Sequence, residues 1–121
     1  MENKDEKNIN VQNIQTQMRK GILEYCILLA MDRGEIYSSD ILTELKNENL
    51  LVVEGTLYPL LSRLRTNGLL DYAWRESKNG PPRKYYKLTE QGKKTLKQLN
   101  KTWSNLSLSV NSLKKKYEKN N

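Results

Sequence analysis

The leucines between Glu54 and Leu70 restrict the fold more than any other feature of the chain. Leu57, Leu60, Leu61 and Leu64 stand at i, i+3, i+4 and i+7, the spacing of one apolar stripe along a helix. Asn67-Gly68 follows directly and supplies the left-handed residue with which many helices end. A helix with one apolar stripe needs a partner layer for that stripe and leaves its other face in solvent.

Two further helical patterns precede this segment. The first has its apolar residues at helical spacing and stops at Gly34; they are Ile14, Met18, Ile22, Tyr25, Leu28 and Leu29. The second pattern starts with the serines of Tyr37-Ser38-Ser39-Asp40 as an N-cap and ends near Asn47, with Ile41, Leu42 and Leu45 as its buried stripe. Residues 50–53 are apolar and predict a short extended link.

A β-hairpin is expected after the third helix. Residues 69–76 and 83–88 read as two strands, joined by a polar turn at residues 77–82 in which Asn79-Gly80 fits. A two-stranded ribbon is not stable alone, so its apolar side chains should lean on the helices: Leu70, Tyr72, Trp74, Tyr86 and Leu88. The order of three helices and a hairpin is that of a winged helix, a mostly α fold with a small β-hairpin.

In a winged helix the second of two helices joined by a turn is presented to the DNA major groove, and the hairpin is a wing beside it. The surface of the third helix opposite the leucines carries Thr56, Tyr58, Pro59, Ser62, Arg63 and Thr66, with Arg65 on a flank. Arg63, Ser62 and Thr66 are expected to read bases, since Arg forks onto guanine and hydroxyl groups bond base edges. Thr56 and Tyr58 should hold phosphates, together with Lys78, Arg83 and Lys84 of the wing. The alternative is a polar surface helix with no ligand.

The charge is distributed unevenly along the chain. Residues 1–62 contain 6 Lys and Arg against 10 Asp and Glu, whereas residues 63–121 contain 15 against 4. A basic half of this kind favours a polyanionic partner, with nucleic acid first and an anionic membrane surface second. The alternative is that the lysines only keep a small protein soluble.

Composition argues against several classes of protein. The chain has no histidine and a single cysteine, Cys26, so the usual general base near neutral pH and a multi-thiolate metal site are missing. We expect no enzyme, no cofactor and no metal, and an inert buried thiol at Cys26 rather than a redox switch. The N-terminal residues lack the pattern of a signal peptide, and the longest apolar run, residues 25–31, is too short for a membrane span. The expected location is the cytoplasm.

Several short motifs occur in a fixed order from about Met18 onward. They are KGILE at 20–24, EGTLYP at 54–59, Arg63-Leu64, GLL at 68–70, Trp74, GPPRKYY at 80–86 and LTEQG at 88–92. Together they resemble the short form of PadR-type transcriptional regulators. The resemblance implies a homodimeric winged-helix repressor that binds an inverted-repeat operator and, in some members, is released by small aromatic or cationic compounds. Residues 37–40 depart from the Tyr-Gly-Tyr-Glu run common in the family, which affects only local contacts.

The C-terminal segment predicts a dimerisation helix. After Thr89 as N-cap, apolar residues alternate in steps of three and four: Leu96, Leu99, Trp103, Leu106, Val110, Leu113 and Tyr117. A helix of about 28 residues runs about 40 Å, which is longer than the small core can cover, so its distal half should pack on a second chain. Ile14 and Met18 of the first helix extend this surface. The alternative is a helix that folds back on its own domain.

The expected organisation is a disordered arm at residues 1–10, a winged helix-turn-helix domain at 11–88, a dimerisation helix at 89–118 and a disordered tail at 119–121. Trp103 has two interpretations: it packs in the seam of the dimer, or, as in multidrug-binding relatives of the resembled family, it stacks on a small-molecule effector between subunits. Two other functions stay open, a winged-helix module that binds proteins without specific DNA binding, and an RNA-binding winged helix.

Overall fold

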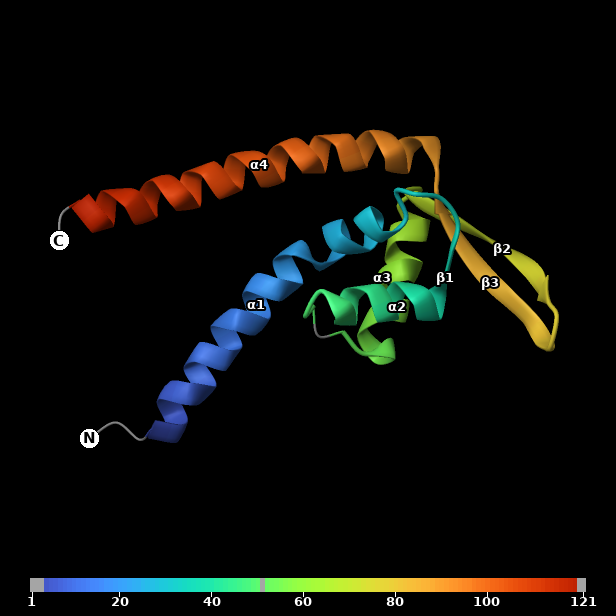
Figure 1. Ribbon diagram of the computed structural model, residues 1–121, viewed down its shortest axis with the longest axis horizontal. Helices are drawn as coiled ribbons and strands as arrows, with labels where there is room; N and C mark the ends of the chain where they lie inside the picture. Colours follow the sequence, from blue (N-terminus) through green and yellow to red (C-terminus); the bar gives the residue numbers. More distant parts are fainter. Residues whose placement is uncertain (1–3, 51, 120–121) are drawn as a thin grey trace.

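The computed structural model describes residues 4–50 and 52–119. Four helices are described, α1 (Lys4–Ala30), α2 (Ser38–Asn47), α3 (Glu54–Thr66) and α4 (Glu90–Lys119), with three strands, β1 (Ile36–Tyr37), β2 (Leu70–Ser77) and β3 (Gly80–Leu88). Figure 1 shows α2, α3 and the sheet gathered at one end of the molecule, while α1 and α4 run away from it and diverge. The predicted winged helix with a long C-terminal helix is confirmed.

Helix α3 has the structure that its sequence predicts. Leu57, Leu61 and Leu64 are each 1% exposed. The helix ends at Thr66, and Gly68 just beyond it has a φ of 79°, a value that L-residues with a side chain seldom adopt. The amide of Gly68 donates to the carbonyl of Arg65, and the amide of Leu69 donates to the carbonyl of Leu64. These two bonds form a Schellman motif and turn the chain directly into β2.

One hydrophobic core joins all the helices to the sheet. The leucines of α3 pack with the end of α1, with Ile41 and Leu45 of α2, and with the first turns of α4. The α1 contribution is Leu23, Ile27, Leu28 and Met31, the sheet contributes Leu70, Tyr86 and Leu88, and α4 contributes Leu96. The predicted packing of the hairpin on the helices is therefore confirmed for these three strand residues, and Tyr72 is partly buried against the same core. Trp74 is 63% exposed and does not take part.

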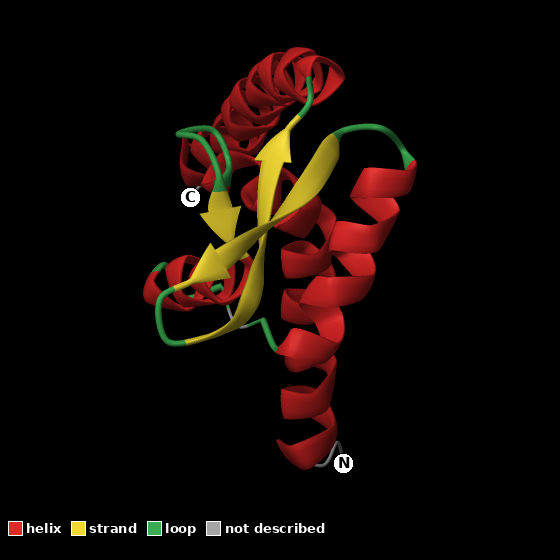
Figure 2. Cartoon of the chain, turned by 90° about the vertical axis from the view of Figure 1, so that its right-hand side faces the viewer, coloured by secondary structure: helices red, strands yellow, loops and turns green. Residues whose placement is uncertain are grey.

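The sheet contains a third strand that the sequence analysis missed. Ile36 and Tyr37 pair with Tyr86 and Tyr85 of β3, so the antiparallel order is β1-β3-β2 (Figure 2). A strand of two residues is too short to show an alternating pattern, and its partner lies about fifty positions away. Because β1 runs straight into α2, it fixes the start of the helix-turn-helix unit against the root of the wing.

The tip of the wing is tighter than predicted. The strands reach Ser77 and Gly80, which face each other in the ladder, so Pro81 and Pro82 lie in β3 and not in the turn. Proline cannot donate a backbone hydrogen bond and is tolerated in a strand where one edge is free. β1 pairs only near Tyr85 and Tyr86, which leaves the outer part of β3 with β2 as its neighbour among the described residues.

Two predicted helix starts are wrong. Residues 4–10 belong to α1 instead of a disordered arm, because no proline or glycine before Gly21 stops the helix from propagating toward its N-terminus. Helix α2 begins at Ser38 with extended Tyr37 as its N-cap, and no side-chain cap bond is formed. Ser38 is buried, which turns its hydroxyl toward Tyr58 of α3 rather than toward the helix end. Residues 1–3, 51 and 120–121 of the predicted arm, link and tail lie outside the described part.

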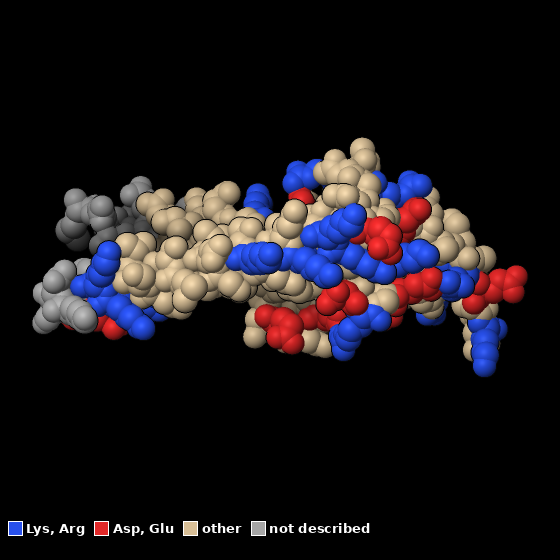
Figure 3. Space-filling model, turned by 90° about the horizontal axis from the view of Figure 1, so that it is seen from above, with Lys and Arg blue, Asp and Glu red and all other residues tan. Residues whose placement is uncertain are grey.

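The outer portions of the two long helices are uncharged, and their large apolar side chains are exposed. We call residues 10–18 the α1 arm and residues 102–113 the α4 arm; neither contains a charged residue. In the α1 arm Met18 is 70% exposed, and in the α4 arm Leu113 is 67% exposed. Figure 3 shows the uncharged stretch of α4 between two groups of basic side chains. In the described part of the chain, no helix is long and apolar enough to cross a membrane.

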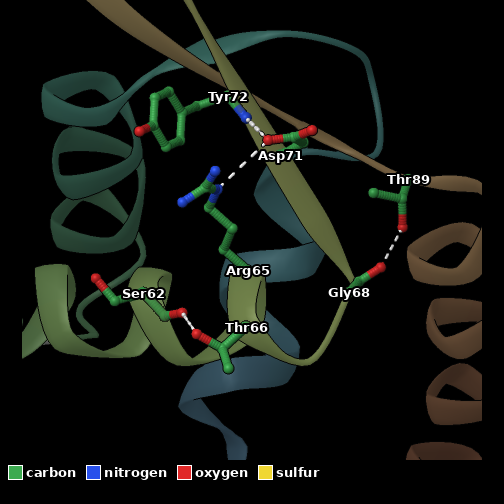
Figure 4. Close-up of polar contacts among 7 residues, drawn as sticks. All are labelled: Ser62, Arg65, Thr66, Gly68, Asp71, Tyr72 and Thr89. Atoms are coloured by element: carbon green, nitrogen blue, oxygen red, sulfur yellow. Dashed lines mark hydrogen bonds and ion pairs between the residues drawn. The ribbon is translucent and has the colours of Figure 1, made fainter.

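Thr89 holds the start of α4 against the end of α3. Its hydroxyl donates to the carbonyl of Gly68 at 2.6 Å (Figure 4). The same hydroxyl accepts from the amide of Gly92 at 2.9 Å, so the predicted N-cap is confirmed. Gly92 is buried in this contact, and a β-carbon there would collide with the carbonyl oxygen of Leu69. The glycine of LTEQG is therefore required for close approach of two backbones.

We predict that Gly92→Ala lowers the free energy of unfolding by about 1–3 kcal/mol, because the backbone of Leu69 must shift to admit the methyl group. Chemical denaturation followed by circular dichroism measures this change. Gly55→Ala is the matched control: it also lies in a helix, nothing lies within 4 Å of its added methyl group, and it should leave stability equal or slightly higher. Equal stability of the two variants would contradict the close contact.

Candidate nucleic-acid interface

The exposed face of α3 is a narrow polar ridge. Its members stand at i, i+4, i+7 and i+11, opposite the buried leucines: Gly55, Pro59, Ser62 and Thr66, all exposed. The hydroxyl of Thr66 donates to the carbonyl of Ser62 at 3.0 Å (Figure 4). Thr66 is therefore left with acceptor capacity, which suits an amino group on a base edge better than a phosphate.

Pro59 lies beyond the first turn of α3. The helix starts at Glu54, so Pro59 is its sixth residue and is inside the helix. Its missing N–H means that the carbonyl of Gly55 receives no ordinary helical hydrogen bond from position 59. Both residues lie on the exposed ridge, where water or a ligand donor can reach that carbonyl.

One flank of the ridge is tied to the wing. The guanidinium of Arg65 stands 4.4 Å from the ring centre of Tyr72, and its Nε donates to Asp71 at 3.4 Å (Figure 4). The same Asp71 oxygen accepts from the backbone amide of Tyr72 at 2.8 Å. That amide bond first, and Arg65 second, hold the pKa of the Asp71 carboxyl below its usual range. On this flank the hydroxyl of Tyr58 also lies 3.3 Å from that of Ser38 in α2.

The other flank of the ridge faces α1. Arg63 forms an ion pair with Glu24, which lies in the KGILE motif of α1. Arg19, Lys20 and Thr56 line a shallow hollow between α1 and the first turn of α3. The two arginines that follow Ser62 therefore point to opposite sides of the helix, Arg63 toward α1 and Arg65 toward the wing.

The three basic side chains of the wing lie in different surroundings. Lys78 is exposed at the tip, and the guanidinium of Arg83 stands 4.9 Å from the ring centre of Tyr37. The ammonium of Lys84 is only 3.9 Å from the ring centre of Tyr72 and 5.7 Å from those of Trp74 and Tyr86. Lys84 is thus half-buried in an aromatic cluster, and to reach a phosphate it has to extend from this cluster.

Sequence reasoning missed the contacts that anchor the wing to the helices. Arg75 of β2 donates through Nε to Glu35 at 2.7 Å, and this hydrogen bond is the main reason why the pKa of the Glu35 carboxyl is lowered. The residues are forty positions apart and carry no local pattern. Arg19 and Lys20, which line the hollow beside Thr56, were not predicted either, although Lys20 opens the KGILE motif. Within the described residues no group of three or more side chains is suited to hold a metal ion.

The geometry defines a winged-helix protein with a polar ridge on α3 between two basic flanks and a basic wing beside it. Residues 27–98 match the family model "Transcriptional regulator PadR-like family". The chain belongs to this PadR-like family and is a transcriptional regulator.

Three solved structures illustrate the similarity. A PadR-like transcription factor from Bacteroides fragilis is 53% identical, with a TM-score of 0.70, over 84% of this chain and 98% of that chain. A PadR-like transcriptional regulator from Bacillus cereus is 38% identical, with a TM-score of 0.73, over 80% and 95%. PadR of Bacillus subtilis in complex with operator DNA is 27% identical, with a TM-score of 0.60, over 64% of this chain and 45% of that longer chain.

We predict that Arg65→Ala raises the pKa of Asp71 only part of the way to its ordinary value, because the backbone bond from Tyr72 remains. Carboxyl carbon shifts measured by NMR during an acid titration give this pKa. Arg83→Ala, which removes a wing cation without a contact to Asp71, is the control and should leave it unchanged. Because the folded pKa is lowered, this carboxylate stabilises the fold above its ordinary pKa, and that stabilisation is lost as the pH falls through the folded value.

Proposed function

We propose that this regulator binds double-stranded DNA in a sequence-specific manner, as a homodimeric repressor of an inverted-repeat operator. In this proposal the protein acts in the cytoplasm and is not an enzyme. The observation that carries the proposal is the exposed ridge of α3 with Arg63 and Arg65 on its two sides. The major groove of B-DNA is about 12 Å wide and admits one helix. The operator complex of Bacillus subtilis PadR, a structural neighbour, supports this use of the fold.

In the proposed complex α3 enters the major groove and the wing lies on the adjacent backbone. Ser62, Arg63 and Thr66 read base edges from the ridge and its α1 flank. Phosphates are held by residues around the ridge and on the wing: Thr56, Tyr58, Arg65, Lys78, Arg83 and Lys84. Pro59 has no donor to offer and would make only van der Waals contact with the DNA. The contacts of Arg65 with Asp71 and Tyr72 favour one fixed angle between helix and wing, so both elements meet the DNA together.

The homodimer is proposed from the two uncharged arms. Helix α4 has 30 residues and so runs about 45 Å, while only its first turns pack on the core. The seam is proposed to contain Leu99, Trp103, Leu106, Val110 and Leu113, with Ile14 and Met18 of α1 beside it. Leu96, which was expected in the seam, is 2% exposed and packs in the core of its own subunit. A two-fold axis through such a seam relates two recognition helices, which is what an inverted repeat requires.

An effector is proposed to act at Trp103. Its ring lies 6.5 Å from that of Tyr25, whose hydroxyl donates to Asn100 at 2.6 Å. Burial first, and the nearby Cys26 second, raise the pKa of Tyr25. The pair forms an aromatic surface where α1 and α4 diverge, and Trp103 is 45% exposed. Flat aromatic or cationic compounds suit such a surface.

The function is tested by selecting duplex DNA from a random pool with purified protein, at near-physiological salt and with competitor DNA. Enrichment of an inverted repeat is the expected result. Binding that salt abolishes and that prefers no sequence would instead point to a protein-binding module, with the lysines serving solubility. A preference for looped or single-stranded RNA over duplex DNA would point to an RNA-binding winged helix.

We predict that Arg63→Ala weakens binding to the enriched duplex by about 1–3 kcal/mol, because a bidentate contact to guanine is lost. Binding to a scrambled duplex should change little. Fluorescence anisotropy with both duplexes at the same salt concentration measures the two affinities. Lys78→Ala is the control, since removal of a cation at the wing tip should weaken both duplexes alike. Equal losses for Arg63→Ala on the two duplexes would refute base reading by this residue.

We predict that Leu106→Glu shifts the protein from dimer to monomer in sedimentation velocity, because it places a charge in the proposed apolar seam. Leu108→Glu is the matched control. Leu108 is 68% exposed on the same helix, but it falls outside the heptad positions. Dissociation by both variants, or by neither, would contradict the proposed seam.

A further inference from the structure

The ion pair between Glu24 and Arg63 joins the helix of the proposed dimer interface to the helix of the proposed DNA interface. The two residues are 39 positions apart, and their side chains are 31% and 65% exposed. Resting on the DNA-binding function proposed above, we propose that Glu24 is a positioning residue that sets the sequence specificity of Arg63. The carboxylate holds the guanidinium at the α1 side of the ridge and so decides which DNA groups it can meet.

The geometry leaves Arg63 able to read a base while it stays paired. Its contact with Glu24 is made through Nη2 to a single carboxylate oxygen. A guanidinium has five N–H donors in one plane, so several remain for another partner. Because about two-thirds of the side chain is exposed, these donors can fork onto the O6 and N7 acceptors of guanine. A side chain that is already held loses less conformational freedom on binding.

The same carboxylate discourages binding to phosphate alone. On DNA without a guanine in register, the charge of Arg63 is already partly neutralised by Glu24, so a phosphate contact contributes less to binding, and the carboxylate itself repels the backbone. Arg65 is restrained in a comparable way by Asp71 and the ring of Tyr72 on the opposite flank. Each arginine beside the ridge thus has a carboxylate partner, which limits their contribution to non-specific affinity.

The test is a double-mutant cycle with wild type, Glu24→Gln, Arg63→Ala and the double variant. Each is measured on the duplex enriched by selection and on a scrambled duplex, by fluorescence anisotropy at one salt concentration. Glu44→Gln is the matched control, because it also removes one negative charge and breaks an ion pair, with Arg33 at 2.6 Å, away from the ridge. Circular dichroism establishes a temperature at which all variants are folded.

We expect Glu24→Gln to raise affinity for scrambled DNA and to reduce the ratio of specific to non-specific affinity by roughly threefold to tenfold, while Glu44→Gln leaves the ratio unchanged. In the Arg63→Ala background the same change at Glu24 should no longer alter the ratio. An equal effect of Glu24→Gln and Glu44→Gln would overturn the proposal. So would an effect of Glu24→Gln that persists without Arg63, since the carboxylate would then act only as a charge.

Arg63→Lys provides a second variant that keeps the cation and can still pair with Glu24. It should preserve binding to scrambled DNA and lose specific binding, because an ammonium cannot fork onto guanine. If Arg63→Lys keeps full specificity, orientation of a guanidinium is not the mechanism. A wild-type protein with no sequence preference would remove the proposed function itself. A specific wild type with a zero coupling in the cycle would remove only this inference.

Discussion

The side chain of Thr89 fixes the relation between the two halves of the molecule. Its single hydroxyl bonds the carbonyl that ends α3 and the amide that starts α4, and buried Gly92 lets the backbones touch. The direction in which α4 leaves the core follows from this contact. Since α4 carries one arm and α3 carries the polar ridge, a displacement at Thr89 would alter how far apart the two ridges lie in the proposed dimer.

Helix α3 is held from both sides in addition to its buried leucines. Arg63 connects it to α1, and Arg65 connects it to the wing through Asp71 and Tyr72. Exposed ion pairs contribute little to stability, so their main effect is to orient side chains rather than to hold the fold. These contacts therefore fix the position of the α3 ridge relative to α1, which is proposed to touch the second subunit. They also fix it relative to the wing, which is proposed to touch the DNA backbone.

The sequence was sufficient where periodicity and glycine geometry decide the structure. The leucine stripe of α3, its end at Gly68 and the cap at Thr89 each follow from local rules and are present. Contacts between distant segments could not be predicted, because one sequence contains no signal for them. Strand β1, the pair of Glu35 with Arg75 and the pair of Glu24 with Arg63 are of this kind. The aromatic surroundings of Lys84 likewise depend on which strand residues share a face.

The absence of charge in both arms has a consequence for the response to ionic strength. Apolar contacts are not screened by salt, whereas contacts of lysine and arginine with phosphates weaken steeply as salt rises. A dimer held through residues 10–18 and 102–113 would therefore keep its subunits together under ionic conditions that release it from DNA. Raising the ionic strength would thus empty the operator without separating the subunits. The free form in a concentrated electrolyte would be an intact dimer ready to rebind.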